Sequence, residues 1–170
     1  AIHSGPGGES SGNSNDIWSA HWPTLTISTD DEDENGNDHF VDGISQVPEY
    51  QLSNGEKNPL GVWCHEFGHE LGLPDYYDTD GSSEGVGNWA VMAAGSWGNN
   101  GETPVYFSAY SRYWLGWDEP VLVQGDIANL VIEPVSEGGK IYKLPIPGNW
   151  TDSEQYFLLE NRQQLSLIHI

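Results

Sequence analysis

The most constraining feature of this sequence is the stretch His65-Glu66-Phe67-Gly68-His69-Glu70-Leu71-Gly72-Leu73-Pro74-Asp75. Its two histidines are four residues apart, so on an α-helix they lie one turn apart on the same face. Two imidazoles in this arrangement can hold one metal ion while Glu66 stands beside it as a base. Asp75, three residues after Gly72, is the candidate third ligand. The stretch therefore predicts a zinc site formed by His65, His69 and Asp75.

The residues around this stretch predict where the helix begins and ends. Asn58 is a favourable N-cap, Pro59 suits the first helical position, and Gly72 suits the position just past the C-terminus. Apolar side chains at spacings of three and four form one stripe, which we expect to face the core: Leu60, Trp63, Phe67 and Leu71. Both histidines lie off this stripe, and we expect them on a bare face where small glycines leave room for a metal and a substrate.

The charge of the chain excludes some partners. Its 170 residues contain 26 acidic and only 5 basic side chains, a net charge of −21. Phosphate contacts would be repulsive, so we expect no nucleic acid or anionic membrane as a partner. The length suits one domain with a real core, and the 36% of hydrophobic residues supply material to bury.

Other features of the sequence concern the cellular setting. Cys64 is the single cysteine, so no intrachain disulfide can form. No run of about 18 apolar residues predicts a transmembrane helix. The chain begins with Ala1 rather than an initiator methionine, and we expect an upstream piece.

An acidic run at residues 30–38 has the spacing of a calcium loop. Counting from Asp31, oxygen-bearing side chains occupy positions 1, 3, 5 and 12, and Gly36 occupies position 6. The candidate ligands are Asp31, Asp33, Asn35 and Asp42. The run departs from the EF-hand pattern because position 12 is Asp rather than Glu and no helices clearly flank it. The alternative is a solvated acidic hairpin tip, next to a strand predicted at 24–29.

The remainder of the chain predicts an α+β fold. A turn is expected at Ser53-Asn54-Gly55, and residues 4–15 have the composition of a loop. Thr103-Pro104 predicts the start of a second helix that ends near Leu115, before Gly116, with Phe107, Tyr110 and Trp114 on its buried face. From Pro120 onward, short apolar runs separated by turn residues predict a β-rich segment: 121–123, 130–132, 140–144 and 155–160.

Several motifs resemble the immune inhibitor A family of secreted bacterial zinc metallopeptidases, which is metzincin-like. Besides His65 to Asp75, the resemblance rests on His3-Ser4-Gly5-Pro6-Gly7, Ile17-Trp18-Ser19, Leu73 to Asp78, Met92 to Trp97, Ser111 to Trp117 and Leu159 to Arg162. It spans most of residues 1–164. The acidic run at 30–38 is where this chain departs from it.

The resemblance implies a zincin-like catalytic domain, an active-site helix and a Met-turn in which Met92 forms a hydrophobic floor beneath the zinc. It also implies a secreted, extracellular enzyme made as a zymogen, with an upstream pro-segment. No tyrosine closely follows Met92, so the group that stabilises the transition state is unassigned. Asp78 and Glu84 stay open as alternatives to Asp75, and a gluzincin-type peptidase with a distant glutamate would use Glu84 or Glu102, with Glu160 as a decoy.

The function that these residues predict is zinc-dependent endopeptidase activity on protein or peptide substrates. A zinc-activated water attacks the peptide carbonyl, and Glu66 acts as the general base and then passes the proton to the leaving amine. The alternative is a calcium-stabilised surface or adhesion module with a structural or vestigial zinc site.

The expected division of the chain has three parts. Residues 1–118 form the catalytic domain, whose N-terminal part is missing, and residues 119–164 form the β-rich segment. Residues 165–170 resemble the translation of a sequencing adapter, and we expect them to be an artefact.

Overall fold

The structure, a computed structural model, describes residues 1–51, 56–146 and 155–163. The chain forms two compact units, Ala1–Tyr106 and Phe107–Ile170. The turn expected at 53–55 and the tail at 165–170 lie outside the described residues.

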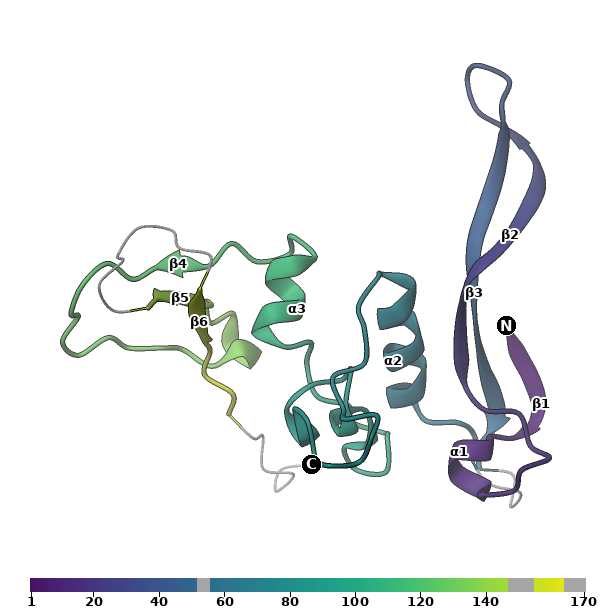
Figure 1. Ribbon diagram of the computed structural model, residues 1–170, viewed down its shortest axis with the longest axis horizontal. Coiled ribbons are helices and arrows are strands. Elements are labelled where there is room, and N and C mark those ends of the chain that lie inside the picture. The colour runs from purple at the N-terminus through teal and green to yellow at the C-terminus, as the bar shows by residue number, and fades with distance from the viewer. Residues whose placement is uncertain (52–55, 147–154, 164–170) are drawn as a thin grey trace. The chain divides into compact units, whose positions relative to one another are not determined.

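The first unit contains a three-stranded sheet with the order β1-β3-β2 (Figure 1). Strand β1 (Ile2–Pro6) runs parallel to β3 (Asp38–Tyr50), and β2 (Ala20–Glu32) runs antiparallel to it. The loop expected at residues 4–15 is wrong in part, because this region holds the end of β1 and a short helix, α1 (Gly8–Ser11). Ile2 lies opposite Val47, and local composition gives no sign of such a distant partner.

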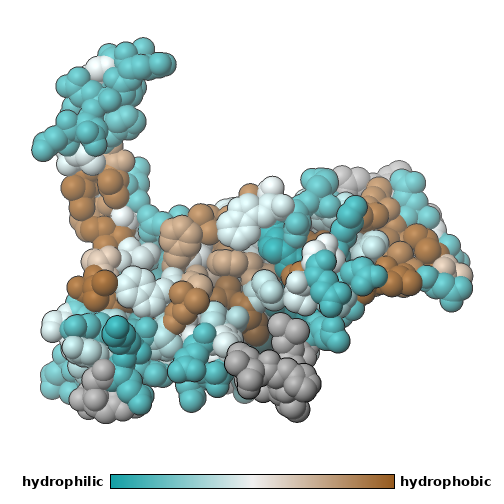
Figure 2. All heavy atoms as spheres, turned by 180° about the vertical axis from the view of Figure 1, so that it is seen from behind, coloured by the Kyte–Doolittle hydropathy of each residue, from teal (hydrophilic) through white to brown (hydrophobic). Residues whose placement is uncertain are grey.

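Strands β2 and β3 form a long hairpin with the acidic run at its tip. The strand expected at 24–29 lies inside β2 and is much shorter than it. The tip is hydrophilic, and beneath it Figure 2 shows a hydrophobic band on the hairpin. The exposed apolar side chains of the hairpin include Leu25, Ile27, Phe40 and Val41. The acidic run at 30–38 thus forms the end of β2, the connecting turn and the first residue of β3.

The histidine motif lies on α2 (Leu60–Glu70). Pro59 rather than Asn58 is the N-cap residue, one position later than expected. At the other end, Gly72 adopts φ +89°, its N–H donates to the His69 carbonyl at 2.9 Å, and the Leu73 N–H donates to the Gly68 carbonyl at 3.0 Å. These two bonds are a Schellman motif, so Gly72 ends the helix as expected.

The side of α2 that is buried is not the apolar stripe that was expected to face the core. Leu60, Trp63 and Phe67 are 60%, 37% and 57% exposed, whereas the buried residues are Gly61, Val62, Glu66 and Gly68. The reason is a close backbone contact: the Gly61 N–H donates to the Gly101 carbonyl at 2.8 Å, and a Cβ at Gly61 would lie 1.8 Å from the Ser96 carbonyl oxygen. The helix docks through its small residues, so the apolar stripe does not face the core of the described chain.

Short turns complete the first unit. Two 3₁₀ segments, Gly87–Trp89 and Ala94–Trp97, flank a run in which Ala90, Val91, Met92 and Ala93 are at most 2% exposed. This run supplies the most deeply buried part of the unit's core.

The second unit contains α3 (Ala109–Trp114), a 3₁₀ turn (Val135–Glu137) and a sheet of order β4-β5-β6. The strands are β4 (Val121–Leu122), β5 (Tyr142–Pro145) and β6 (Tyr156–Leu159), with β4 parallel and β6 antiparallel to β5. Three of the four expected runs overlap these strands, but the run at 130–132 is not a strand.

The expected start of the second helix is wrong. Residues Thr103 and Pro104 precede the helix, and the N-cap is Ser108, whose Oγ accepts a hydrogen bond from the Ser111 N–H at 3.1 Å. The expected buried face is also wrong, because Tyr110 and Trp114 are 49% and 54% exposed while Ala109, Ser111 and Arg112 are buried. Arg112 is buried because its guanidinium pairs with Asp118 at 2.6 Å and Glu160 at 3.0 Å.

The observed elements confirm a mixed α/β chain with few helices. Over the described ranges, no helix has the length and hydrophobicity needed to cross a membrane.

The position of the N-cap can be tested by substitution. We expect Ser108→Ala to lower the free energy of unfolding by about 1 kcal/mol, because the Ser111 N–H loses its acceptor. The matched change Thr103→Ala should stay within about 0.5 kcal/mol of wild type. Urea denaturation of the three proteins measures both values, and a larger loss for Thr103→Ala would contradict the observed helix start.

Candidate metal centre

The two histidine rings of α2 are oriented by main-chain carbonyls. The Nδ1 atom of His65 lies 2.9 Å from the Val91 carbonyl oxygen, and that of His69 lies 2.8 Å from the Leu73 carbonyl oxygen. A carbonyl can only accept, so each Nδ1 carries a proton and donates it. In the neutral rings, Nε2 is therefore left with its lone pair, which is the form that binds metals.

Asp75 meets both histidines. The left-handed turn at Gly72 sends the chain back along the helix, and Asp75 Oδ1 lies 3.1 Å from His65 Nε2 and 3.2 Å from His69 Nε2. One ligand atom from each of the three residues lies within 4.8 Å of the others, and this is the only such His, Cys, Asp or Glu group in the part of the chain that the structure describes.

These three atoms present an electrostatic problem that a cation resolves. Two neutral Nε2 atoms and a carboxylate oxygen are all acceptors, so they repel one another when nothing lies between them. Asp75 Oδ1 is buried and has no hydrogen-bond donor while both rings are neutral; a ring that takes up a proton on Nε2 can donate to it. Two imidazole nitrogens and one carboxylate oxygen form a donor set that suits zinc. The residues present therefore fit the metal that the sequence predicts.

The pKa shifts of His69 and Asp75 also favour a positive charge between them. The hydrogen bond to Asp75 raises the pKa of His69 above its ordinary value, against the effect of burial. Burial raises the pKa of Asp75, but hydrogen bonds from His65, His69 and Tyr77 outweigh it and hold that pKa well below its usual range. Both shifts favour a proton or another cation between the ring and the carboxylate.

Glu66 lies beside this group in a different environment. It is 7% exposed, and burial raises its pKa, which the neighbouring charges of His65 and His69 only partly oppose. A carboxylate whose pKa is raised toward neutrality is better suited to take up and release a proton.

Met92 follows Val91, whose carbonyl contacts His65. Its side chain is fully buried, and its carbonyl accepts a hydrogen bond from the Tyr76 N–H at 2.7 Å. The preceding carbonyl, that of Val91, accepts the His65 hydrogen bond. The segment that contains Met92 thus contacts both the first histidine and the chain that follows Asp75.

The acidic residues considered as alternatives to Asp75 do not join the two histidines. Asp78 accepts hydrogen bonds from the Asp80 N–H and from the Ser82 and Ser83 hydroxyls. Glu102 accepts one from the Asn99 amide, and Glu160 pairs with Arg112 and Arg162. Glu84 is likewise outside the group formed by His65, His69 and Asp75.

The structure does not bring the four calcium candidates together. Asp33 forms the turn, where it accepts hydrogen bonds from Asn35 and Asn37 that lower its pKa to about 2. Asp42 lies opposite Thr26 on the hairpin, and Asp31 is five residues further along β2, roughly 16 Å at the usual rise per residue. Calcium binding by Asp31, Asp33, Asn35 and Asp42 stays a prediction.

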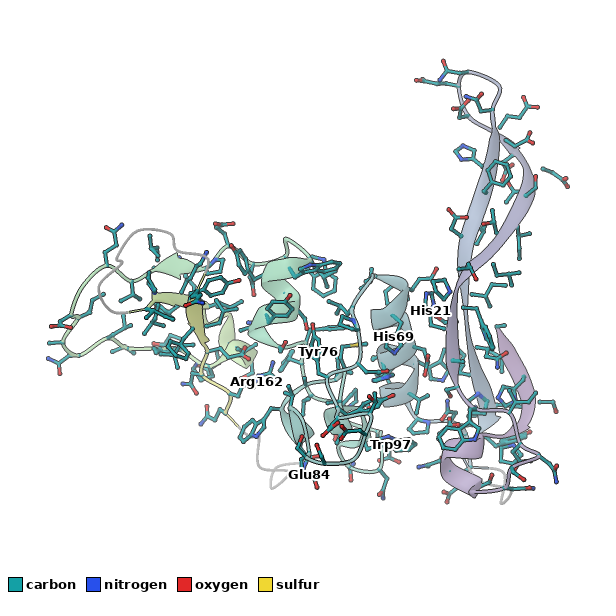
Figure 3. All side chains as sticks on the ribbon, viewed as in Figure 1. His21, His69, Tyr76, Glu84, Trp97 and Arg162 are labelled. Carbon is teal, nitrogen blue, oxygen red and sulfur yellow. The ribbon has the colours of Figure 1, made fainter. Side chains whose placement is uncertain are left out.

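Sequence reasoning missed two aromatic neighbours of the site. The Tyr77 ring stacks on His65 with centroids 6.1 Å apart, and the His21 ring stacks on His69 at 6.3 Å (Figure 3). Tyr77 could have been suspected because it follows Asp75 by two residues. His21 lies on β2, far from the motif in the chain, and no local signal points to it.

A histidine pair and a glutamate on one helix, met by an aspartate after a glycine turn, form a set of residues that suits a metallopeptidase centre. The comparisons with known proteins identify the family: residues 1–118 match the immune inhibitor A peptidase M6 catalytic domain. The chain belongs to this family, which confirms the resemblance found in its motifs.

Two relatives agree with this assignment. Immune inhibitor A of Bacillus thuringiensis subsp. alesti is 33% identical over 137 residues, which cover 76% of this chain and 19% of that protein. The pre-pro-metalloprotease PrtV of Vibrio cholerae serotype O1 is 46% identical over 59 residues, which cover 32% of this chain and 6% of that protein. The chain thus spans less than a fifth of the length of these curated relatives. No solved structure matches it.

The contact between His69 and Asp75 predicts a titration result. In the metal-free protein, Asp75→Asn should lower the pKa of His69 toward 6.5, because the amide no longer stabilises the charged ring. Following the His69 ring protons by NMR across pH measures this. An unchanged pKa of His69 in Asp75→Asn would contradict the contact.

Proposed function

We propose that this chain carries the catalytic centre of a zinc-dependent endopeptidase that hydrolyses proteins or peptides. The observation that carries the proposal is the convergence of His65 Nε2, His69 Nε2 and Asp75 Oδ1 beside the buried Glu66. Membership of the M6 peptidase family and the metalloprotease name of one relative support it.

His65, His69 and Asp75 would hold the ion in this proposal. Each of the three side chains also has a hydrogen bond to the surrounding protein: both Nδ1 atoms donate to carbonyls, and Tyr77 hydrogen-bonds the Asp75 carboxylate. Such outer contacts fix ring orientation and strengthen ligands. Bound zinc supplies a Lewis acid that lowers the pKa of water and polarises a peptide carbonyl.

Glu66 moves the proton. Its carboxylate accepts a proton from the attacking water and then delivers it to the nitrogen of the leaving amine. Burial of Glu66 supports this role because it raises the pKa toward the range in which one group can do both. A purely structural metal site has no need of a buried carboxylate at this place, which favours a peptidase over the adhesion module.

The remaining assignments follow from family membership. Met92 serves as the Met-turn of a zincin-like domain, and its burial next to the Val91 carbonyl supports that role. We propose a secreted bacterial enzyme made as a zymogen, in keeping with a relative named as a pre-pro-metalloprotease. An upstream pro-segment is part of this proposal.

The role of Glu66 predicts loss of activity without loss of metal. In the full-length protein, Glu66→Gln should reduce cleavage of casein by at least about 100-fold while zinc content stays unchanged. Glu102→Gln, which changes a carboxylate outside the centre, is the matched control and should retain activity. Wild-type activity in Glu66→Gln would rule out the general-base assignment.

The role of Asp75 predicts loss of the metal itself. Asp75→Ala should weaken zinc binding by more than the roughly 10–100-fold typical of losing an outer-shell partner. Competition with a chelator of known affinity measures the change. Asp78→Ala and Glu84→Ala should bind zinc as wild type does; if one of them loses zinc and Asp75→Ala does not, that residue is the third ligand.

A further inference from the structure

His21 lies beside the metal centre and belongs to none of the roles assigned so far. It projects from β2 toward α2, where its ring stacks on His69 at an interplanar angle of 25° (Figure 3). Its side chain is only 12% exposed. The ring therefore lies next to one of the three residues proposed to hold the metal.

One nitrogen of His21 is held by the protein. Nδ1 lies 3.0 Å from Glu70 Oε2 and 3.2 Å from Ser45 Oγ. The Ser45 hydroxyl is itself 3.1 Å from the Glu66 carbonyl oxygen, to which it donates. An ionised carboxylate only accepts, so the contact with Glu70 places a proton on His21 Nδ1. The neutral ring then has an acceptor lone pair on Nε2.

The other nitrogen, Nε2, is not fully buried. Among the described residues, Nε2 takes part in no hydrogen bond. It is also absent from the buried polar atoms that lack a partner, so part of its surface is open to solvent. The ring is held on one side by the Nδ1 contacts with Glu70 and Ser45 and on its face by His69. It packs closely over Gly43, where an added Cβ would lie 3.1 Å from His21 Cε1. The result is a fixed ring with one acceptor atom reaching the surface next to His69.

We propose that His21 is a substrate-binding residue whose Nε2 accepts a hydrogen bond from a main-chain N–H of a bound polypeptide. This inference rests on the proposed function. A main-chain N–H is the donor that every peptide carries whatever its side chains, and an acceptor fixed beside the metal centre would set the register of the chain there. The same atom would disfavour a carbonyl oxygen at that place, because two acceptors repel.

A purely structural role for His21 makes a different prediction. The Glu70 contact could serve only to join β2 to α2. His21→Asn separates the two roles, because an asparagine amide N–H reaches the place of Nδ1 and can still donate to Glu70, whereas nothing occupies the place of Nε2. His39→Asn, on the exposed hairpin, is the matched control.

The test measures peptide binding in the full-length Glu66→Gln protein loaded with zinc, so that no cleavage interferes. A substrate peptide and versions N-methylated at one main-chain nitrogen at a time are titrated by calorimetry. We expect one N-methylated peptide to bind about 3–10-fold more weakly than the parent, the value of one hydrogen bond. With His21→Asn added, the parent should weaken by a similar factor and this difference should vanish.

The outcomes are separable. Persistence of the N-methyl discrimination in His21→Asn, or unchanged affinity for the parent peptide, would overturn the inference, and so would a protein that binds no peptide. If His21→Asn is misfolded by circular dichroism, His21→Gln replaces it; its amide oxygen reaches the place of Nε2, and discrimination should be retained. Absence of casein cleavage by the wild-type enzyme would overturn the proposed function without altering this binding comparison.

Discussion

The candidate metal centre depends on the two hydrogen bonds that orient the histidine rings of α2. Because the Val91 and Leu73 carbonyls accept from Nδ1 of His65 and His69, both Nε2 lone pairs point to the place where Asp75 arrives. Without these bonds, either ring could present a proton instead of a lone pair. The cluster of acceptors, the raised pKa of His69 and the fit to zinc all follow from this orientation.

Glycines place those carbonyls within reach. The Schellman turn at Gly72 brings Leu73 back against the end of the helix and leads the chain to Asp75. At the other end, Gly61 lets α2 approach the backbone of Ser96 and Gly101 more closely than any side chain would permit. This approach also explains why the apolar residues Leu60 and Phe67 are on the exposed side.

The errors of sequence interpretation share one cause. Asn58 and Thr103 are good caps by residue type, yet the helices start at Leu60 and Ala109 because neighbouring backbone contacts outweigh a local preference of about 1 kcal/mol. The same holds for β1, which exists because it pairs with β3. In the acidic run, whose spacing suits a calcium loop, strand pairing separates Asp42 from Asp31, and calcium binding there stays a prediction.

The parts of the site that depend on local geometry can be predicted from the sequence. Spacing on a helix places His65 and His69 on one face, and a left-handed turn at Gly72 precedes Asp75, since both are properties of a few consecutive residues. The residues that orient and surround the ligands become known from the folded chain: the Val91 carbonyl, the buried side of α2, and the His21, Ser45 and Glu70 contacts. These contacts join residues far apart in the chain, so no local pattern of residues carries them.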